Sequence, residues 1–103
     1  MVRRGEIWWY EPPHKNARPH LIMSRTEVIP YLSDVLAIPA SSTVRNIPTE
    51  VFLSKSDGMP RDCVLNADSM GPVGTVYLTT RITSLEPDRM SEVCEAMRIA
   101  TGC

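Results

Sequence analysis

"HLIMSRTEVIPYLSDVLAIPA" (residues 20–40) decides the fold of this chain, because it holds two short apolar runs joined by a polar connection. The runs "HLIMS" (20–24) and "VLAIPA" (35–40) have the length of buried strands and are short for core helices. The connection is expected to hold a helical turn before Pro30. The stretch therefore predicts two core strands.

Shorter strand patterns lie on both sides of these two runs. On the N-terminal side, "GEIWWY" (5–10) is rich in aromatic and β-branched residues. On the C-terminal side the predicted strands are "TEVFL" (49–53), "CVLNA" (63–67) and "TTRITSL" (79–85). Residues 68–77 are expected to be irregular. Many short strands separated by turn signals favour a small barrel or a curled antiparallel sheet.

The hydrophobic period changes in the last segment, "EPDRMSEVCEAMRIATGC" (86–103). Pro87 suits the first turn of a helix, and Gly102 is a plausible stop. One apolar face with helical spacing is formed by Met90, Val93, Cys94 and Met97. The predicted fold is mainly β with a C-terminal helix, built as one domain over residues 1–103.

Composition places the chain among small globular domains. It has 103 residues, 43% of them hydrophobic, and a formal net charge of -1, so bulk charge does not indicate a nucleic-acid partner. The first 25 residues, however, are net positive and the remainder net negative, which predicts a local positive patch. No apolar run approaches the roughly 20 residues of a membrane span. We expect a soluble cytoplasmic protein that does not contact a membrane.

The three cysteines have spacings that match no metal motif. Cys63 lies in an apolar run and Cys94 on the predicted helical face, so both are interpreted as small core residues in a reducing compartment. We therefore expect no metal site and no cofactor.

Polar side chains stand where the two core strands begin or end. Pro19 restricts its own backbone and biases Arg18 towards an extended conformation, so a long cationic side chain is held stiffly beside the core. Ser41 and Ser42 directly follow the other strand. Turn formation is the ordinary explanation for such serines. Paired with Arg18, they suggest a shared polar rim.

Histidines and tryptophans offer further candidates. His20 is interpreted first as a structural histidine and, in the alternative, as a proton shuttle. Trp8 and Trp9 are adjacent in a strand and so point to opposite faces, one towards the core and one towards a base or partner. No Gly-rich phosphate loop, HExxH or G-x-S-x-G motif occurs.

Five ordered blocks of the chain resemble the MazF/PemK toxin family, the mRNA interferases of type II toxin–antitoxin systems. The resemblance spans roughly residues 3 to 101. Its blocks are "RGEIWWY", "ARPHLIMS", "VLAIPASSTVRNIPTEVFL", "PRDCVLNADSM" and "RITSLEPDRMSEVCEAM". Each block alone is unspecific, but the ordered set is quite specific.

This resemblance implies an SH3-like β-barrel of the MazF, Kid and CcdB type, acting as a homodimer. It implies metal-independent, sequence-specific cleavage of single-stranded RNA, giving 2′,3′-cyclic phosphate and 5′-hydroxyl ends, and inhibition by a MazE-like antitoxin. The family's catalytic arginine falls on Arg18. Its catalytic threonine falls on Ser41, two residues after Pro39, with Ser42 as the alternative. Serine keeps the hydroxyl but drops a methyl, so we expect its role to survive with a looser rotamer.

Other side chains are candidates for contacts with RNA rather than for catalysis. Either tryptophan, Trp8 or Trp9, would stack on a base, and Lys15 belongs to the positive N-terminal segment. Candidates for base-edge contacts on "LNADSM" are Asn66, Asp68 and Ser69. Two alternative functions stay open: a CcdB-like toxin that binds gyrase, and an RNA-binding barrel without catalytic activity.

Overall fold

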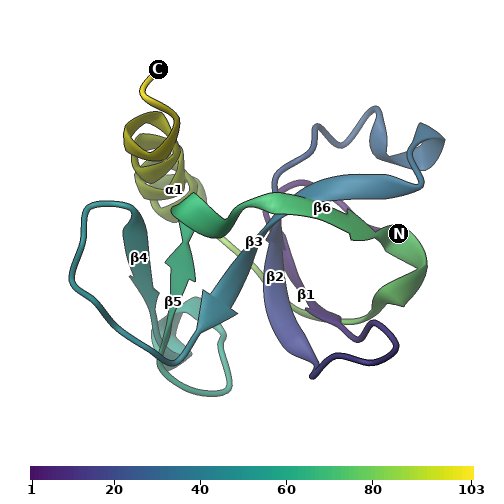
Figure 1. The fold of residues 1–103 in the computed structure, drawn as a ribbon, viewed down its shortest axis with the longest axis horizontal. Helices are drawn as coiled ribbons and strands as arrows, with labels where there is room; N and C mark the ends of the chain where they lie inside the picture. The colour runs from purple at the N-terminus through teal and green to yellow at the C-terminus, as the bar shows by residue number, and fades with distance from the viewer.

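The two apolar strands of the sequence lie at the centre of a curled antiparallel sheet in the computed structural model, which describes all of residues 1–103 (Figure 1). The strand order is β4-β5-β3-β2-β1-β7, and β6 pairs with β3 outside this path. The strands are β1 (Glu6–Tyr10), β2 (Arg18–Ile22), β3 (Asp34–Ser41), β4 (Glu50–Leu53), β5 (Cys63–Asn66), β6 (Gly71–Gly74) and β7 (Leu78–Ser84). One helix, α1 (Pro87–Thr101), ends the chain.

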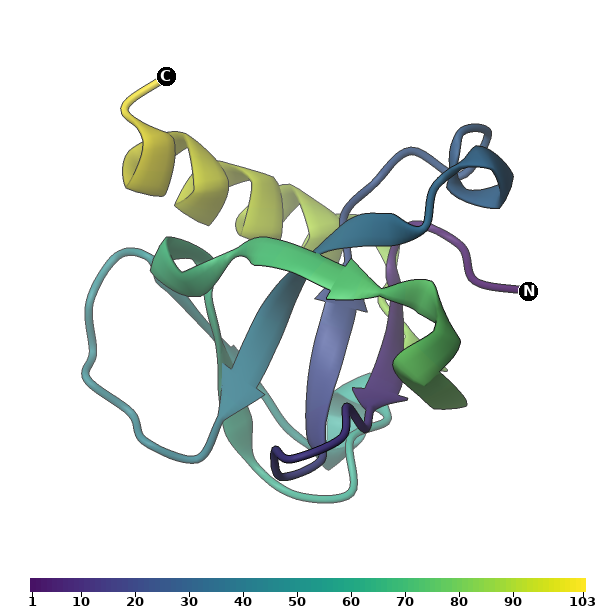
Figure 2. The same ribbon diagram turned by 45° about the vertical axis from the view of Figure 1, so that its right-hand side comes forward.

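Both faces are buried over His20–Ile22 of β2 and over Ala37 and Ile38 of β3, which explains why these strands read as continuous apolar runs. Successive side chains of a strand point to opposite faces. Leu21 and Ile38 belong to the larger core cluster, which α1 closes through Val93. Ile22, one residue along β2, belongs to a second cluster on the other face. In Figure 2, β6 crosses in front of these central strands and α1 lies above it.

The terminal helix follows the predicted bounds but buries a different set of side chains. Gly102 has a φ of 74° and its N–H donates to the carbonyl of Arg98 at 2.9 Å, so the left-handed residue that glycine tolerates ends the helix. Val93 and Ala96 are buried. The expectation that Cys94 is a core residue was wrong, because it is exposed at the edge of this face. Cys63 is buried as expected.

The prediction failed for residues 68–77, which were expected to be irregular. Gly71–Gly74 form β6, paired antiparallel with Asp34–Ala37 of β3. Glycine and proline disfavour strands locally, so this strand exists because of its tertiary pairing rather than its propensity. The predicted helical turn is a 3₁₀ turn over Ile29–Tyr31, which contains Pro30 rather than ending before it. No helix combines the length and apolar character needed to cross a membrane.

Candidate active site

β3 changes its pairing partner along its length, and a hollow lies where it does so. Its pairing with β2 ends at the pair His20↔Pro39, and its pairing with β5 begins at the next residue, Ala40↔Leu65. Proline has no N–H to donate, so Pro19 and Pro39 favour the end of the β2–β3 ladder here. If the β2–β3 pairing were continued by two residues beyond His20↔Pro39, Arg18 would lie across from Ser41.

The opening between the two strands is a hollow of about 300 Å³, which we name the serine hollow. Arg18 and Ser41 both line it. The other lining residues are Trp9, Ala17, Pro19, Ala40, Ser42, Thr43, Pro60, Arg61, Asp62 and Cys63. The structure thus brings the arginine and the serines of the predicted rim to one place.

Arg18 is the exposed first residue of β2, and its side chain has no partner in the protein. The five ion pairs of the structure involve other residues, and no hydrogen bond is made by its guanidinium group. A planar guanidinium with unoccupied donors is well suited to bind two oxygens of a phosphate. Arg18 is therefore placed to bind an anion in the hollow.

The two candidate serines differ in how firmly they are held. Ser41 is the half-buried last residue of β3, and its Oγ accepts a hydrogen bond from the N–H of Thr43 at 3.1 Å. Its hydroxyl hydrogen remains free to donate. Ser42 is exposed in the loop that follows. Ser41 is thus the better positioned donor. Thr43 is a third hydroxyl in the hollow that the sequence did not single out.

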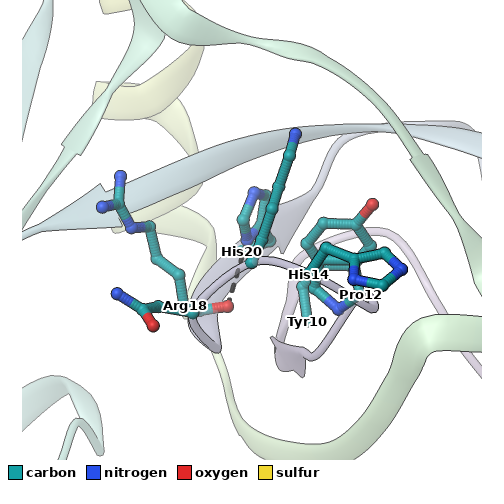
Figure 3. Close-up of a pocket in the computed structure, with 7 residues that line it drawn as sticks. Tyr10, Pro12, His14, Arg18 and His20 are labelled. Carbon is teal, nitrogen blue, oxygen red and sulfur yellow. Dashed lines mark hydrogen bonds between the residues drawn. The ribbon is translucent and has the colours of Figure 1, made fainter.

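A second hollow of about 670 Å³ adjoins the first and shares Arg18 with it; we name it the histidine hollow (Figure 3). It is lined by Tyr10, Pro12, His14, Lys15, Asn16, Arg18 and His20. In Figure 3 the guanidinium group of Arg18 extends away from Tyr10, Pro12 and His14. None of the lining residues is acidic, so this half of the site favours anions. Lys15 lines this hollow, and its contact with RNA stays a prediction.

His20 is a buried residue whose tautomer the structure determines. Its Nδ1 lies 3.1 Å from the carbonyl oxygen of Arg18. A carbonyl can only accept, so Nδ1 carries the hydrogen and Nε2 of the neutral ring is a free acceptor. The ring also meets Tyr10 edge-on, with centroids 4.9 Å apart. Burial, together with the charge of Arg18, lowers the pKa of His20 below its ordinary value of 6.5 and outweighs the hydrogen bond to the Arg18 carbonyl, which raises it.

Acidification is expected to weaken the fold through His20. The unfolded chain takes up a proton at higher pH than the folded one, so stability is full above pH 6.5 and falls as the pH decreases from there. Urea unfolding at about pH 7.5 and about pH 5.5 should show this loss in the wild type and a smaller loss in His20→Gln. His14→Asn, at an exposed histidine with a φ of 69°, is the control and should keep the wild-type loss. A loss of stability in His20→Gln equal to that of the wild type would show that His20 is not the group responsible.

The two tryptophans point to different places, as the alternation of a strand requires. Trp9 lines the serine hollow beside Arg18. Trp8 packs against the second core cluster, and its Nε1 donates to Glu6 at 3.0 Å. Trp9 is therefore the tryptophan available for stacking.

The carboxylate of Glu6 is held in its charged form by the groups around it. Burial raises the pKa of Glu6, but hydrogen bonds from Trp8, the Arg3 N–H and Arg81 outweigh this, so its pKa lies below the ordinary value.

The residues predicted to read base edges on "LNADSM" do not line either hollow. Asn66 is at the opposite end of β5 from Cys63, and its side chain accepts from the N–H of Asp68 at 3.1 Å and donates to Ser69 Oγ at 3.2 Å. Asp68 also accepts from Thr49 Oγ1 at 2.6 Å. These side chains hold a 3₁₀ turn together, which is a structural role.

Arg61 and Asp62 were missed in the sequence, where they stand within a turn cluster. They directly precede β5, as Arg18 opens β2, and this shared position at a strand start is the signal that could have found them. Both are exposed and neither forms an ion pair. Burial, with Asp62 and Asp57 nearby, raises the pKa of the neighbouring Cys63 thiol, so the thiol stays neutral and is a poor nucleophile.

The arrangement suits binding and orientation of a phosphodiester more than metal chemistry. No group of three or more His, Cys, Asp or Glu side chains is placed to hold a metal ion. Instead, two unpaired guanidinium groups, a positioned hydroxyl and an indole ring line the serine hollow.

The chain is similar to known proteins over nearly its whole length. Residues 3–101 match the model of a family described as PemK-like, MazF-like toxin of type II toxin-antitoxin system. The chain is 37% identical over 104 residues to the probable endoribonuclease MazF5 of Mycobacterium tuberculosis, covering 100% of this chain and 95% of that protein. A solved mycobacterial endoribonuclease in complex with its cognate antitoxin superposes with a TM-score of 0.86 at 27% identity, covering 99% and 96% of the two chains. The solved structure of the M. tuberculosis toxin MazF-mt6 superposes with a TM-score of 0.86 at 28% identity, covering 94% of this chain and 96% of that chain.

Proposed function

Because this chain belongs to the PemK-like, MazF-like family of type II toxin–antitoxin toxins and is an endoribonuclease, we propose that it cleaves single-stranded RNA without a metal ion. The RNA supplies its own nucleophile, the 2′-hydroxyl, which attacks the adjacent phosphate. The products are a 2′,3′-cyclic phosphate and a 5′-hydroxyl end. Cleavage is specific for a short sequence, and messenger RNA in the cytoplasm is the first expected target, with ribosomal and transfer RNA as the alternatives.

The observation that carries this proposal is the pairing of Arg18 and Ser41 in one hollow. As the 2′-oxygen bonds to phosphorus, negative charge grows on the phosphate oxygens, and Arg18 stabilises it with its two parallel donors. Ser41 donates to a phosphate oxygen or positions the attacking hydroxyl. The proton of the 2′-hydroxyl passes to solvent or, in the alternative, to Nε2 of His20, and the departing 5′-oxygen takes a proton from solvent.

The direct test is cleavage of a long RNA by the purified protein in excess EDTA. Cutting should continue at the full rate, because no step of the proposed reaction uses a metal ion. Every new 5′ end should carry a hydroxyl, which end-labelling with and without prior phosphatase treatment detects. Activity that disappears in EDTA and returns with Mg²⁺ would reject the metal-free mechanism. Binding of RNA without any cleavage would instead favour a non-catalytic barrel.

We further propose that a MazE-like antitoxin inhibits the enzyme by covering both hollows. Arg18, Lys15 and Arg61 face solvent there without ion-pair partners. A flexible chain rich in acidic and apolar residues mimics the phosphate backbone and competes with RNA for these cations. Inhibition of this kind should weaken as the salt concentration rises.

A homodimer is proposed on the basis of exposed apolar side chains on β3 and in the turns beside β3 and β6. Leu36 is 45% exposed on β3 and Val76, just beyond β6, is 81% exposed. Tyr31, before β3, is 87% exposed. Apolar surface of this kind is typical of interfaces between subunits. A second copy of the chain is the proposed occupant.

Sedimentation at micromolar concentration should therefore find the dimer as the smallest stable species. Leu36→Asp is expected to shift it to monomer, because the substitution buries a charge in the proposed interface. Phe52→Asp is the control, since Phe52 is 51% exposed on β4, away from this surface. A fully active wild-type monomer would contradict the dimer.

A further inference from the structure

Asp62 is an acidic side chain in a hollow that is otherwise suited to RNA. It is exposed, forms no ion pair and accepts no hydrogen bond, although Arg18 and Arg61 line the same hollow. It does not hold the loop in place as Asp57 does, whose carboxylate caps a turn at Ser54 and pairs with Arg89. The carboxylate of Asp62 is thus free to interact with a ligand.

A carboxylate beside a phosphate-binding site disfavours RNA as a polyanion, because it repels the backbone that the arginines attract. The carboxylate contributes favourably to RNA binding only where it accepts hydrogen bonds from donors of the RNA. Ionised carboxylates accept hydrogen bonds and cannot donate them. In single-stranded RNA those donors are the 2′-hydroxyls, which every nucleotide carries, and the exposed base edges, which differ from base to base. The charge of Asp62 therefore selects among bases while it weakens binding to phosphate.

We propose that Asp62 is a specificity-determining residue that accepts a hydrogen bond from the amino group of a base next to the scissile phosphate. This inference rests on the proposed function and deepens it. Adenine, cytosine and guanine carry such an amino group. Uracil does not, and its single N–H lies between two carbonyl oxygens that the carboxylate repels. RNA with uracil at this position is therefore the disfavoured substrate.

The neighbouring side chains give this contact its geometry. Trp9 lines the same hollow and offers a flat surface on which the selected base stacks. Arg61 precedes Asp62 directly and binds the phosphate on the far side of that base. Arg18 holds the scissile phosphate. The base is thus fixed by stacking and by its two flanking phosphates, with its edge towards Asp62.

The test compares cleavage of an RNA library randomised on both sides of the scissile bond. Wild-type enzyme should prefer amino-bearing bases over uracil at one position by about 5- to 100-fold, the range expected for one good base contact. Asp62→Asn should reduce this preference several-fold, chiefly by faster cleavage of the uracil substrates, since an amide both donates and accepts. Asp88→Asn, an equal charge change at the exposed start of α1, should leave the preference unchanged.

Two results would overturn the inference. One is an equal change in the cleavage of all substrates by Asp62→Asn, which would make Asp62 a general electrostatic group. The other is an unchanged preference. Competition binding with uncleavable 2′-deoxy versions of the library separates this inference from the proposed reaction. A base preference in binding that Asp62→Asn erases would support it even if the wild-type protein did not cleave RNA.

Discussion

Arg18→Lys is expected to reduce the rate of RNA cleavage by about 10²-fold or more, the usual cost of losing one transition-state donor. Lysine keeps the positive charge but offers a single point of contact, whereas the guanidinium binds two phosphate oxygens at once. Single-turnover kinetics with saturating enzyme isolate the chemical step from binding. Arg18→Ala should lose at least as much activity as the lysine variant.

The matched control for this substitution is Arg25→Lys. Arg25 is also exposed and without an ion pair, but it lines neither hollow. It should keep the wild-type rate. Ser41→Ala should lose less activity than Arg18→Ala, because a neutral donor contributes less than a charged one. A near-wild-type rate for Arg18→Lys would show that Arg18 is only a surface charge, and an inactive Ser42→Ala with active Ser41→Ala would move the hydroxyl role by one residue.

A single 2′-deoxy substitution on the 5′ side of the scissile bond is expected to abolish cleavage while leaving binding nearly intact. The edit removes the proposed nucleophile, but it leaves the phosphate and base contacts that dominate affinity. Gel analysis of cleavage and a competition measurement of binding, with the same oligonucleotide, check both halves of this expectation.

The control places the deoxy substitution one nucleotide further along, on the 3′ side, where the sugar supplies no nucleophile. That substrate should be cut at close to the normal rate. If water were the nucleophile, the first deoxy substrate would still be cut, and its product would carry an ordinary terminal phosphate instead of a cyclic one. Such a product would reject the mechanism.

The sequence predicted those parts of the fold in which local pattern and tertiary packing agree. The continuous apolar runs of β2 and β3 were recognised because both faces are buried in the central parts of these strands. β6 was missed because its glycines and proline gain their strand conformation from pairing with β3. Cys94 was predicted to be buried because its spacing matches the apolar stripe of a helix. The face of α1 that packs against the core is narrower than this stripe, and Cys94 lies outside it.

The candidate site shows the same division. Arg18 and Ser41 were found through their positions at strand ends and through the family resemblance, and the structure brings both to one hollow. Arg61 and Asp62 could not be found in this way, because a turn-rich segment gives no indication of which strand end it faces. Only the pairing of β3 with β5 brings that segment to the serine hollow.

The exchange of partners by β3 has a consequence for how this enzyme can be controlled. Arg18 and Ser41 are the terminal residues of strands whose central parts are packed on both sides, so moving either residue would require the core itself to open. Rigid positioning of this kind makes allosteric distortion energetically costly. We therefore expect an inhibitor to act by occupying the entrance, and its release to restore a working site at once, without a refolding step.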